Sequence, residues 1–376
     1  MNVKILALSI VAIVCVGAVA AYFVAFDDNE EGPIEIVDGS GKTITLSEPL
    51  SDVVVVNTNI PKQMKILGLE DEVVGIAYAS QATSDRSGAL TALFPNLYDN
   101  NNIPFTKNIT GESMVMITKC VICPVKSMSL SETQEKDLAN LGVIVIRLDC
   151  NGDTALDDLK KLTILFGETK PIMDAYDGYY DLYYSVVDTV KEKVKLAPST
   201  ADNTFLYYMV SSKWIYNQTS DGNTMIETVY GKNVLRNINN IPLTGVTNDA
   251  TDTGIGEVIR DEDVKNPISK IFLRAQSTSP TVTTAENEWN TSVFGTSVLY
   301  EGLSAIDTGE VYMFNSNIMS GCLSYVGYVL LAEVCGIETG YDAADIIEEY
   351  NETYGFEEST SGLVFQISGG KATMLF

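Results

Sequence analysis

Eight polar or aromatic residues lie just beyond the ends of predicted strands, where α/β proteins usually bind ligands. They are Asn57, Tyr78, Lys126, Trp214, Arg274, Gln276, Asn315 and Tyr325. The rings of Tyr78 and Trp214 can stack on a flat or apolar ligand, whereas Lys126 and Arg274 can pair with a carboxylate, a phosphate or an anionic chelate. Each residue could instead serve a loop or the core, but together they favour an organic or anionic ligand over a bare cation.

Metal ligation and catalysis find little support in the sequence. The chain contains no histidine, which removes the commonest metal ligand and the commonest general base. Cys120 and Cys123 have the spacing of a metal or redox pair, but they fall in a predicted buried strand, where positions three apart face opposite sides. No G-x-S-x-G nucleophile motif is present, and the "GIG" of residues 254–256 is too short for a phosphate loop. We therefore predict a protein without a metal site or catalytic residues.

The composition narrows the range of partners. The 376 residues include 24 basic and 50 acidic side chains, which give a net charge of −26. Such a surface repels phosphate backbones, so nucleic acid is excluded as a partner. A length of 376 residues is sufficient for two packed domains behind a leader segment.

Alternating strands and helices dominate the chain up to residue 167. The sequence predicts a hairpin around Gly39 and Gly41, a strand of four valines at 53–56 and a capping box at Ser131–Gln134 that opens a helix. Runs such as "EVVGIA", "CVICPV" and "VIVIRLDC" predict further buried strands. This alternation predicts a parallel α/β lobe.

A long helix is predicted from Pro171 to Leu196, near the middle of the chain. Its apolar residues recur at alternating spacings of three and four, which defines one continuous stripe on the helix. The stripe consists of Met173, Tyr176, Tyr180, Tyr183, Val187, Val190 and Val194. After this helix, the strand–helix alternation restarts, with strands predicted in "NTFLYYMV", "SKIFLRAQ" and "EVYMFN" and a capping box at Thr224–Glu227. We therefore predict two similar Rossmann-like α/β lobes, joined by one stiff helix, with a ligand bound between them.

The first 26 residues indicate export. Ile5 to Phe26 contains no charged residue, follows the only nearby lysine, Lys4, and precedes an acidic run. We expect an uncleaved transmembrane anchor at 1–26 with the body on the extracytoplasmic face; a cleaved signal peptide ending near Ala18–Ala20 is the alternative. From the N-terminus, we expect five segments: an anchor or signal segment 1–26, an acidic linker 27–33, a first lobe 34–167, an interlobe helix 168–197 and a second lobe 198–376.

Two segments resemble the iron–siderophore/cobalamin class of ABC-transporter substrate-binding proteins, in an archaeal-type anchored form. At the front, "IEIVDGSGKTITLSEPLSDVVVVNTNIPKQMKILGLEDEVVGIA" resembles the hairpin, valine strand and helix that open the family. At the back, "GEVYMFNSNIMSGCLSYVGYVLLAEVCG" followed by "DAADIIEEYNETYGF" resembles its ending, with Ala344 in place of the usual proline. The resemblance covers residues from about 34 to 365.

The resemblance implies that the chain captures an iron chelate, cobalamin or a related metal complex between its lobes and delivers it to an ABC permease dimer with a cytoplasmic ATPase. In the family, one acidic residue of each lobe docks on arginines of the permease. The matching positions here are Glu112 in "NITGESMVMITKCVI" and Glu262 in "RDEDVKNPISKIFL", with Glu257 and Asp263 as rivals for the second. The alternatives are an anchored extracellular sensor or binding module, and a two-lobed α/β enzyme without a recognisable catalytic motif.

Overall fold

The structure, a computed structural model, describes most of the chain after residue 31. The described residues are 32–77, 94, 118–125, 130–198, 203–210, 214–216, 220–237, 246–249, 253–277 and 280–376. The expected membrane segment at residues 5–26 lies outside these ranges. Within them, no helix combines the length and the apolar composition that a membrane crossing requires.

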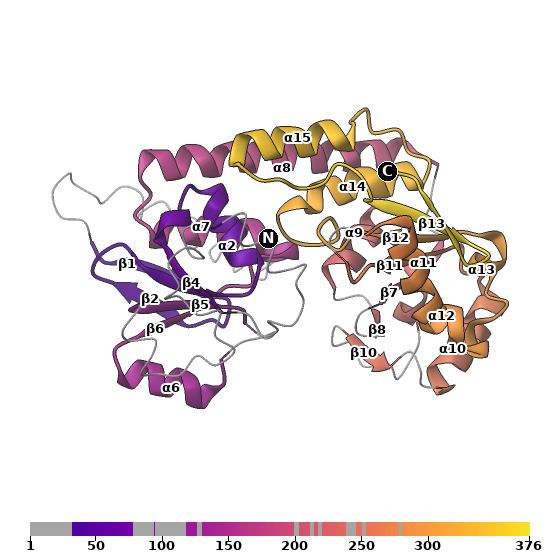
Figure 1. The fold of residues 1–376 in the computed structure, drawn as a ribbon, viewed down its shortest axis with the longest axis horizontal. Coiled ribbons are helices and arrows are strands. Elements are labelled where there is room, and N and C mark those ends of the chain that lie inside the picture. Colours follow the sequence, from indigo (N-terminus) through magenta and orange to yellow (C-terminus); the bar gives the residue numbers. More distant parts are fainter. Residues whose placement is uncertain are drawn as a thin grey trace, which may run out of the picture.

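The first lobe is built on a four-stranded parallel sheet in the order β4-β3-β5-β6 (Figure 1). A separate antiparallel hairpin of β1 and β2 precedes it, as predicted. The four valines of β3 are all buried, which agrees with a strand that is covered on both faces. The elements of this lobe are β1 (Ile34–Val37), β2 (Thr43–Leu46), β3 (Val53–Val56), α2 (Asn59–Ile66), η1 (Glu70–Glu72), β4 (Val73–Ala77), β5 (Cys120–Cys123), α6 (Glu132–Asn140), β6 (Ile144–Arg147), η2 (Gly152–Thr154) and α7 (Ala155–Leu165).

The second lobe contains an eight-stranded mixed sheet in the order β10-β8-β7-β11-β12-β13-β14, with β9 paired to β7. Strands β7, β11 and β12 are parallel, but β8 and β13 run antiparallel to their neighbours. The strands are β7 (Thr204–Met209), β8 (Trp214–Tyr216), β9 (Lys232–Asn233), β10 (Val246–Asp249), β11 (Lys270–Arg274), β12 (Val311–Phe314), β13 (Val364–Ser368) and β14 (Lys371–Met374). The helices are α9 (Asp221–Val229), η3 (Val234–Asn237), α10 (Thr253–Lys265), α11 (Val282–Thr291), α12 (Val293–Thr296), η4 (Val298–Tyr300), α13 (Ser304–Thr308), η5 (Gly321–Leu323), α14 (Ser324–Val334) and α15 (Ala343–Tyr354).

The two lobes are thus less alike than the strand–helix alternation predicted. The chain ends in the β13–β14 hairpin, which the sequence analysis did not identify. Its turn is formed by Gly369 (φ +55°) and Gly370 (φ +78°), and a two-residue hairpin turn with positive φ at both positions favours glycine. The Gly-Gly pair between two alternating segments was the signal that could have revealed it.

The capping boxes predicted for the two lobes had different outcomes. Ser131 and Gln134 form the predicted box at the start of α6. The box predicted at Thr224–Glu227 is wrong, because the N-cap of α9 is Ser220, four residues before Thr224. The Thr224 hydroxyl donates instead to the Ser220 carbonyl oxygen (3.3 Å), one turn back within the helix.

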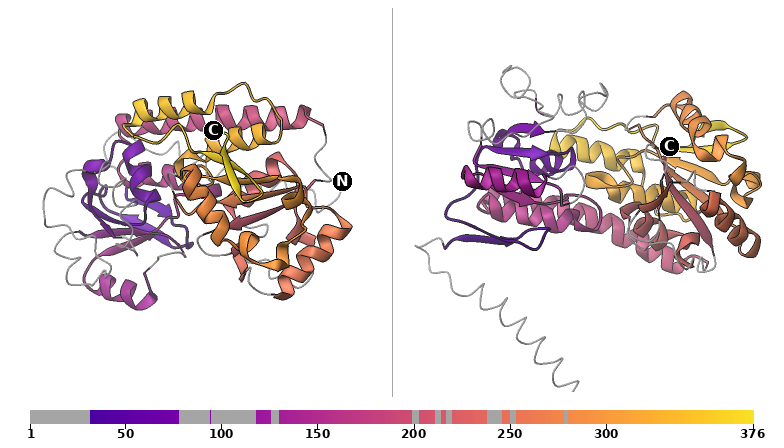
Figure 2. Two further views of the ribbon diagram at one scale, coloured as in Figure 1. Left: turned by 45° about the vertical axis from the view of Figure 1, so that its right-hand side comes forward. Right: turned by 90° about the horizontal axis from the view of Figure 1, so that it is seen from below.

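The predicted long helix is α8 (Lys170–Leu196), which runs along both lobes in Figures 1 and 2. It contacts α2 and α7 of the first lobe and α9 and α14 of the second. Its fully buried side chains are Ile172, Tyr179, Val186, Val187 and Val190. One hydrophobic core, continuous through α8, therefore includes residues of both lobes.

The stripe predicted on α8 is correct in its C-terminal half and shifted in its N-terminal half. Tyr179 is 1% exposed, whereas Tyr180, which was predicted to be in the stripe, is 38% exposed. Tyr179 is buried because it packs edge-on against Tyr325 of α14 and Tyr354 of α15, which cover that side of the helix. Tyr180 and Tyr184 instead line a pocket of ≈ 570 Å³ beside α8.

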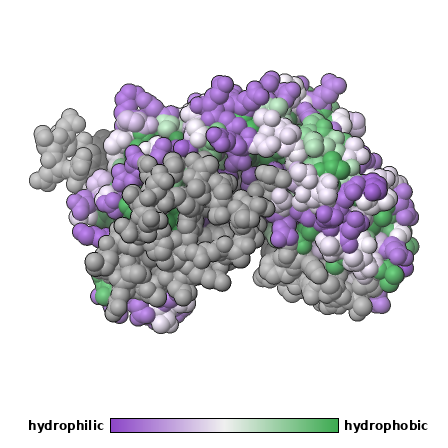
Figure 3. Space-filling view, viewed as in Figure 1, coloured by the Kyte–Doolittle hydropathy of each residue, from purple (hydrophilic) through white to green (hydrophobic). Residues whose placement is uncertain are grey.

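The face seen in Figure 1 is largely hydrophilic along its upper edge, where α8 and α15 lie (Figure 3). Its hydrophobic side chains are gathered in small patches among polar ones. The buried side chains of α8, such as Val186, Val187 and Val190, face the hydrophobic core.

Removal of the Tyr179 hydroxyl should weaken the attachment of α8 to the second lobe. This hydroxyl donates to the Cys322 carbonyl oxygen (2.7 Å), and both groups are buried. We expect Tyr179→Phe to lower the free energy of unfolding by about 1–2 kcal/mol, because the carbonyl loses its partner. Urea denaturation measures the change. Tyr176→Phe is the matched control, since no hydrogen bond from that half-buried hydroxyl occurs among the described residues, and an equal loss in both variants would contradict the assignment.

Candidate functional site

The carboxyl edges of the two sheets, where their parallel strands end, face each other below α8. Asn59 at the start of α2 lies beside Gly321 of the second lobe: a Cβ on Gly321 would be 3.3 Å from Asn59 Oδ1. The first-lobe η2 also contacts the second-lobe α9. β3 leads directly into α2, and β12 leads into the segment before η5. Both sheet edges therefore open onto the same boundary between the lobes, beside Asn59 and Gly321, which we call the seam.

One ion pair crosses this seam. The Lys62 ammonium of α2 lies 2.5 Å from Glu358 Oε1, and the Asn317 amide donates to Glu358 Oε2 (3.0 Å). The side chains of Lys62 and Glu358 are only 14% and 16% exposed. Glu358 is itself held in place, because its backbone exchanges two hydrogen bonds with the Asn351 side chain. The pair therefore fixes the spacing of the lobes at the base of the seam.

Asn57 lies at this edge, as predicted, but its side chain serves the backbone. It is buried and has φ +122°, an unusual conformation for a non-glycine residue. Its Oδ1 accepts the N–H groups of Asn59 and Ile60, both at 3.0 Å. Asn57 thus stabilises the start of α2 at the first-lobe wall of the seam.

Arg274, the last residue of β11, is the second-lobe cation at the carboxyl edge. Its half-buried guanidinium donates to the Ser320 hydroxyl (2.9 Å). No carboxylate pairs with it among the residues that the structure describes. In a chain with a net charge of −26, an arginine in this setting is suited to an anionic ligand.

Gln276 and Asn315 occupy neighbouring positions on the same wall. The Gln276 side chain is exposed, and its backbone N–H donates to Glu288 Oε2 (2.7 Å). Asn315 is buried, and its Oδ1 accepts the Asn317 N–H (2.9 Å). The structure thus brings Asn57, Arg274, Gln276 and Asn315 to the two facing edges, as the sequence predicted.

Tyr325 is a correction to the predicted site. Its side chain is fully buried within α14, against Tyr179 and Tyr183 of α8, so it belongs to the core and cannot reach a ligand in the seam. Burial raises the pKa of its phenol well above the ordinary value of 10. Trp214 begins β8, while Tyr78 and Lys126 lie outside the described residues.

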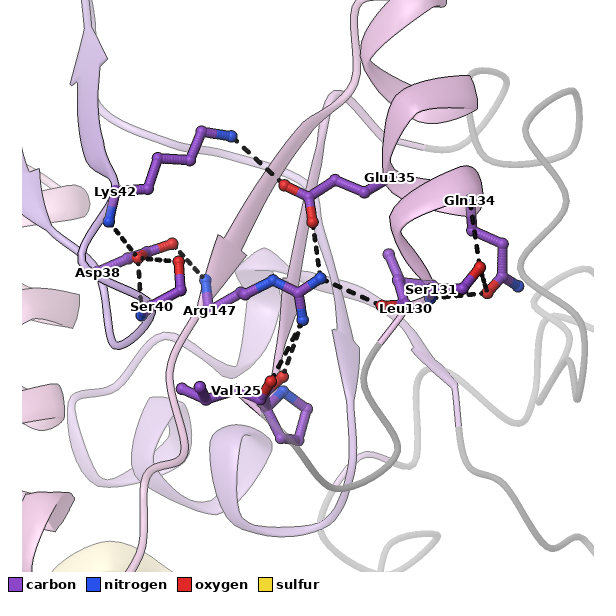
Figure 4. Close-up of polar contacts among 10 residues, drawn as sticks. Asp38, Ser40, Lys42, Val125, Leu130, Ser131, Gln134, Glu135 and Arg147 are labelled. Carbon is purple, nitrogen blue, oxygen red and sulfur yellow. Dashed lines mark hydrogen bonds and ion pairs between the residues drawn. The ribbon is translucent and has the colours of Figure 1, made fainter.

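Arg147, the last residue of β6, organises the segment that follows β5 in the first lobe (Figure 4). Its guanidinium lies 2.6 Å from Glu135 Oε2 and donates to the carbonyl oxygens of Pro124, Val125 and Leu130. The Arg147 N–H donates to Asp38 Oδ2 (3.2 Å), which ties the β1–β2 hairpin to the same point. Unlike Arg274, Arg147 is therefore engaged in holding the wall of the site together.

The acidic residues expected to dock on a permease have different environments. Glu262 of α10 is half-exposed and pairs with Lys265 (2.8 Å), and Glu257 on the same helix is exposed. Asp263 is buried: it accepts the backbone N–H groups of Ile268 (2.7 Å) and Ser304 (3.1 Å). Asp263 is thus a structural residue and cannot compete with Glu262 for docking, while Glu112 lies outside the described residues.

Metal ligation by cysteine has no support from the geometry. Cys120 and Cys123 are both buried in β5, and burial raises the pKa of each thiol. Thiolates, the form that binds metals, are therefore disfavoured at both positions. Within the described ranges, no group of three or more acidic, cysteine or histidine side chains could hold a metal ion.

A pocket of ≈ 430 Å³ lies at the opposite, amino edge of the first-lobe sheet. It is lined by residues 45–52, which lead into β3, and by Thr118, Lys119 and Ile144 at the starts of β5 and β6. It therefore faces away from the interlobe seam and lies apart from the candidate site.

Sequence reasoning missed several residues that build the site. Lys62 and Glu358 are 296 positions apart in the chain, so no local pattern could pair them. Ser320, Glu288 and Asp158 were also unrecognised, since a buried polar residue inside a helix or loop carries no signature that separates it from a surface one.

The seam ion pair should contribute measurably to stability. We expect Lys62→Met to lower the free energy of unfolding by about 1–3 kcal/mol, because it leaves the Glu358 carboxylate with one partner in a largely buried position. Lys371→Met is the control: that lysine is 80% exposed and lies 3.7 Å from Glu286, so its loss should cost less than about 0.5 kcal/mol. Equal losses by urea denaturation would show that the seam pair has no special role.

Glu288 should make stability depend on pH. Burial raises the pKa of its carboxyl above the ordinary 4.5, more than the N–H groups of Gln276 and Ser277 lower it. Because the folded chain binds this proton more tightly than the unfolded chain, the stabilisation is fully present below the ordinary pKa and is lost as the pH rises through the raised value. Relative to Glu288→Gln, the wild-type free energy of unfolding should therefore fall from about pH 4 upward. A difference that stays constant between pH 4 and 7 in urea titrations would contradict this.

No protein-family model and no curated protein matches the sequence. Solved structures are nevertheless similar to the chain along most of its length. FepB, a TroA-like periplasmic binding protein from Veillonella parvula, is 13% identical, with 89% of this chain and 100% of that one covered and a TM-score of 0.63. CeuE from Helicobacter pylori, solved with Ni(II), is 12% identical, with 87% and 98% covered and a TM-score of 0.57.

A third structure comes from the ABC-type Fe³⁺-hydroxamate transport system of Saccharomonospora viridis. It is 17% identical, with 81% of this chain and 100% of that one covered and a TM-score of 0.53. At such identities the comparison concerns architecture rather than activity. The chain has the two-lobed α/β fold of the TroA-like periplasmic binding proteins.

Proposed function

We propose that this chain is the extracytoplasmic substrate-binding component of an ABC importer. It captures a siderophore-like iron chelate, cobalamin or a related metal complex between its lobes and delivers it to a membrane permease. The observation that carries the proposal is the position of Arg274. This half-buried cation ends β11 at the interlobe seam, and it has no acidic partner among the described residues.

The architecture supports binding in a largely preformed site. A single helix packed along both lobes resists wide hinge closure, and the Lys62–Glu358 pair further fixes the lobes at the base of the seam. A ligand then enters a site whose walls are already in place, which reduces the ordering cost of binding. Such a site suits a bulky, rigid chelate better than a small ion that must be enclosed.

The solved structures with this fold support the same class of cargo. CeuE was solved with Ni(II) bound, and the Saccharomonospora viridis protein comes from an ABC-type Fe³⁺-hydroxamate transport system. The anionic groups of many metal chelates match a guanidinium, so Arg274 could bind the organic part of a complex rather than its metal.

Membrane attachment and docking belong to the same proposal. Residues 5–26 anchor the chain, with first lobe 34–167, interlobe helix 168–197 and second lobe 198–376 on the extracytoplasmic face. Glu112 and Glu262 dock on a permease dimer whose ATPase lies in the cytoplasm, and the chain performs no catalysis itself. The partial exposure of Glu262 agrees with a docking role. On docking, a permease arginine can replace Lys265 as the partner of the Glu262 carboxylate.

The test is a thermal-shift panel on the soluble body, residues 32–376. The probes are a ferric trihydroxamate, a ferric triscatecholate, haemin and cyanocobalamin. A ligand at 100 times its Kd stabilises the folded state by about 2.7 kcal/mol, which raises Tm by several degrees. Absence of a shift with every probe would contradict the proposed cargo class.

Arg274→Gln should weaken binding of the anionic chelate that gives the largest shift. Loss of a charge-assisted hydrogen bond costs about 1.5–3 kcal/mol, so Kd should rise about tenfold to a hundredfold in isothermal titration. Arg260→Gln on the exposed face of α10 makes the same charge change away from the seam, and its Kd should match the wild type. If both variants bind equally well, Arg274 does not contact the ligand.

A further inference from the structure

Two buried carboxylates hold the loops that form the facing walls of the seam. Asp158 of α7 is buried at 2% exposure, and its Oδ2 accepts the N–H groups of Asp149 (3.1 Å) and Cys150 (3.0 Å). Glu288 of α11 is buried at 9% exposure and accepts the N–H groups of Gln276 (2.7 Å) and Ser277 (3.1 Å). Each carboxylate thus binds two successive N–H groups of a loop that follows a parallel strand.

The two loops occupy equivalent places in the lobes. Residues 148–154 follow β6, and residues 275–277 follow β11, so both lie at the carboxyl edge of their sheet. Each carboxylate comes from the helix that follows its strand, and that helix packs within the same lobe. The backbone of each loop is therefore restrained at the carboxyl edge of its sheet.

The first-lobe hydrogen bonds extend beyond the loop that Asp158 holds. Asp149, whose N–H is bound by Asp158, uses its own Oδ1 to accept the Val125 N–H (2.8 Å) after β5. The Thr154 hydroxyl and the Lys161 ammonium also bind Asp158, both at 3.0 Å. The segments after β5 and β6 therefore depend on one buried carboxylate.

The second-lobe hydrogen bonds lead toward the interlobe ion pair. The Ser316 hydroxyl donates to the Ser277 carbonyl oxygen (3.4 Å), and Asn317, the next residue, binds Glu358. Gln276, one of the two residues that Glu288 holds, adjoins Ala275 and Arg274 in sequence. Glu288 thus determines the position of the backbone directly after the proposed ligand-binding arginine.

We propose that Asp158 and Glu288 are positioning residues that hold the two facing loops in the conformation used for ligand binding. Neither side chain touches the ligand. The inference rests on the proposed function for its role in binding, but the loop restraint itself can be measured without any ligand. Desolvation of a carboxylate is costly, and at each wall the two backbone N–H groups that the carboxylate accepts offset part of that cost.

Asp263 provides a matched control within the same chain. It is also buried, and it also binds two backbone N–H groups, those of Ile268 and Ser304. These residues lead into β11 and begin α13, so Asp263 serves the amino edge, away from the seam. Any variant effect that arises merely from loss of a buried carboxylate should therefore appear in Asp263→Asn as well.

The first measurement is hydrogen–deuterium exchange on the ligand-free body of Asp158→Asn, Glu288→Gln and Asp263→Asn. At Glu288 and Asp263 the two N–H groups bind different oxygens, so an amide, which replaces one acceptor by a donor, leaves one N–H without its partner. At Asp158 both N–H groups bind Oδ2, while Oδ1 accepts from the Lys161 ammonium. An asparagine there must turn its donor toward one of these two sets of donors, and both backbone hydrogen bonds lose the carboxylate charge. We expect exchange to accelerate about tenfold or more at residues 149–150 in Asp158→Asn and at 276–277 in Glu288→Gln. In Asp263→Asn it should accelerate at 268 and 304 only. Unchanged exchange at the seam loops would overturn the inference whether or not any chelate binds.

The second measurement is Kd for the panel chelate, by isothermal titration. Asp158→Asn and Glu288→Gln should raise Kd about fivefold to fiftyfold, and Asp263→Asn should leave it unchanged even where its Tm falls as far. Losses of affinity that simply follow Tm across all three variants would overturn the positioning role. If no chelate in the panel binds the wild type, the proposed cargo class fails, and the exchange data alone decide whether the carboxylates restrain the loops.

Discussion

The structure depends on the burial of one face of α8 against both lobes. Val186, Val187 and Val190 and the ring of Tyr179 lie in a hydrophobic core that extends into both lobes without interruption. Each large apolar side chain removed from water contributes roughly 1.5–3 kcal/mol to stability. Together, the apolar contacts of α8 therefore outweigh any single polar interaction between the lobes. The lobes therefore cannot separate or rotate freely without exposing core residues, and the carboxyl edges of the two sheets stay opposed.

Polar groups fix the spacing of the lobes and the positions of the loops at the seam, which the apolar contacts of α8 do not determine. The Lys62–Glu358 pair sets the spacing at the base of the seam, and Arg147 binds the segment after β5 and the β1–β2 hairpin. Asp158 and Glu288 bind the backbone of the two facing loops. In each case a buried charge is satisfied by hydrogen bonds or by an opposite charge, as burial requires. Each element at the seam is thus held by several contacts of its own. A preformed binding site requires this kind of support.

The cations at the carboxyl edges differ in whether a carboxylate pairs with them. The chain carries 50 acidic residues against 24 basic ones, yet three of its cations, Lys62, Arg147 and Arg274, converge on the carboxyl edges. Lys62 and Arg147 are neutralised by Glu358 and Glu135. Arg274 bonds to a serine hydroxyl instead, and no carboxylate among the described residues pairs with it. Under the proposed function, Arg274 is the group that would attract an anionic complex to a chain whose net charge is −26.

The sequence by itself determined the fold class, the long helix and most first-lobe elements, because these depend on local periodicity and on caps such as Ser131–Gln134. It also identified Asn57, Arg274, Gln276 and Asn315 as residues at strand ends, since strand termination is a local property. The tertiary structure decided which side of α8 is buried, moving Tyr179 inward and Tyr180 outward, because α14 and α15 cover one side only. It also moved Tyr325 into the core and Asp263 into a structural role. Contacts such as Lys62–Glu358 and Glu288–Gln276 form between segments that only folding brings together, and no spacing along the chain encodes them.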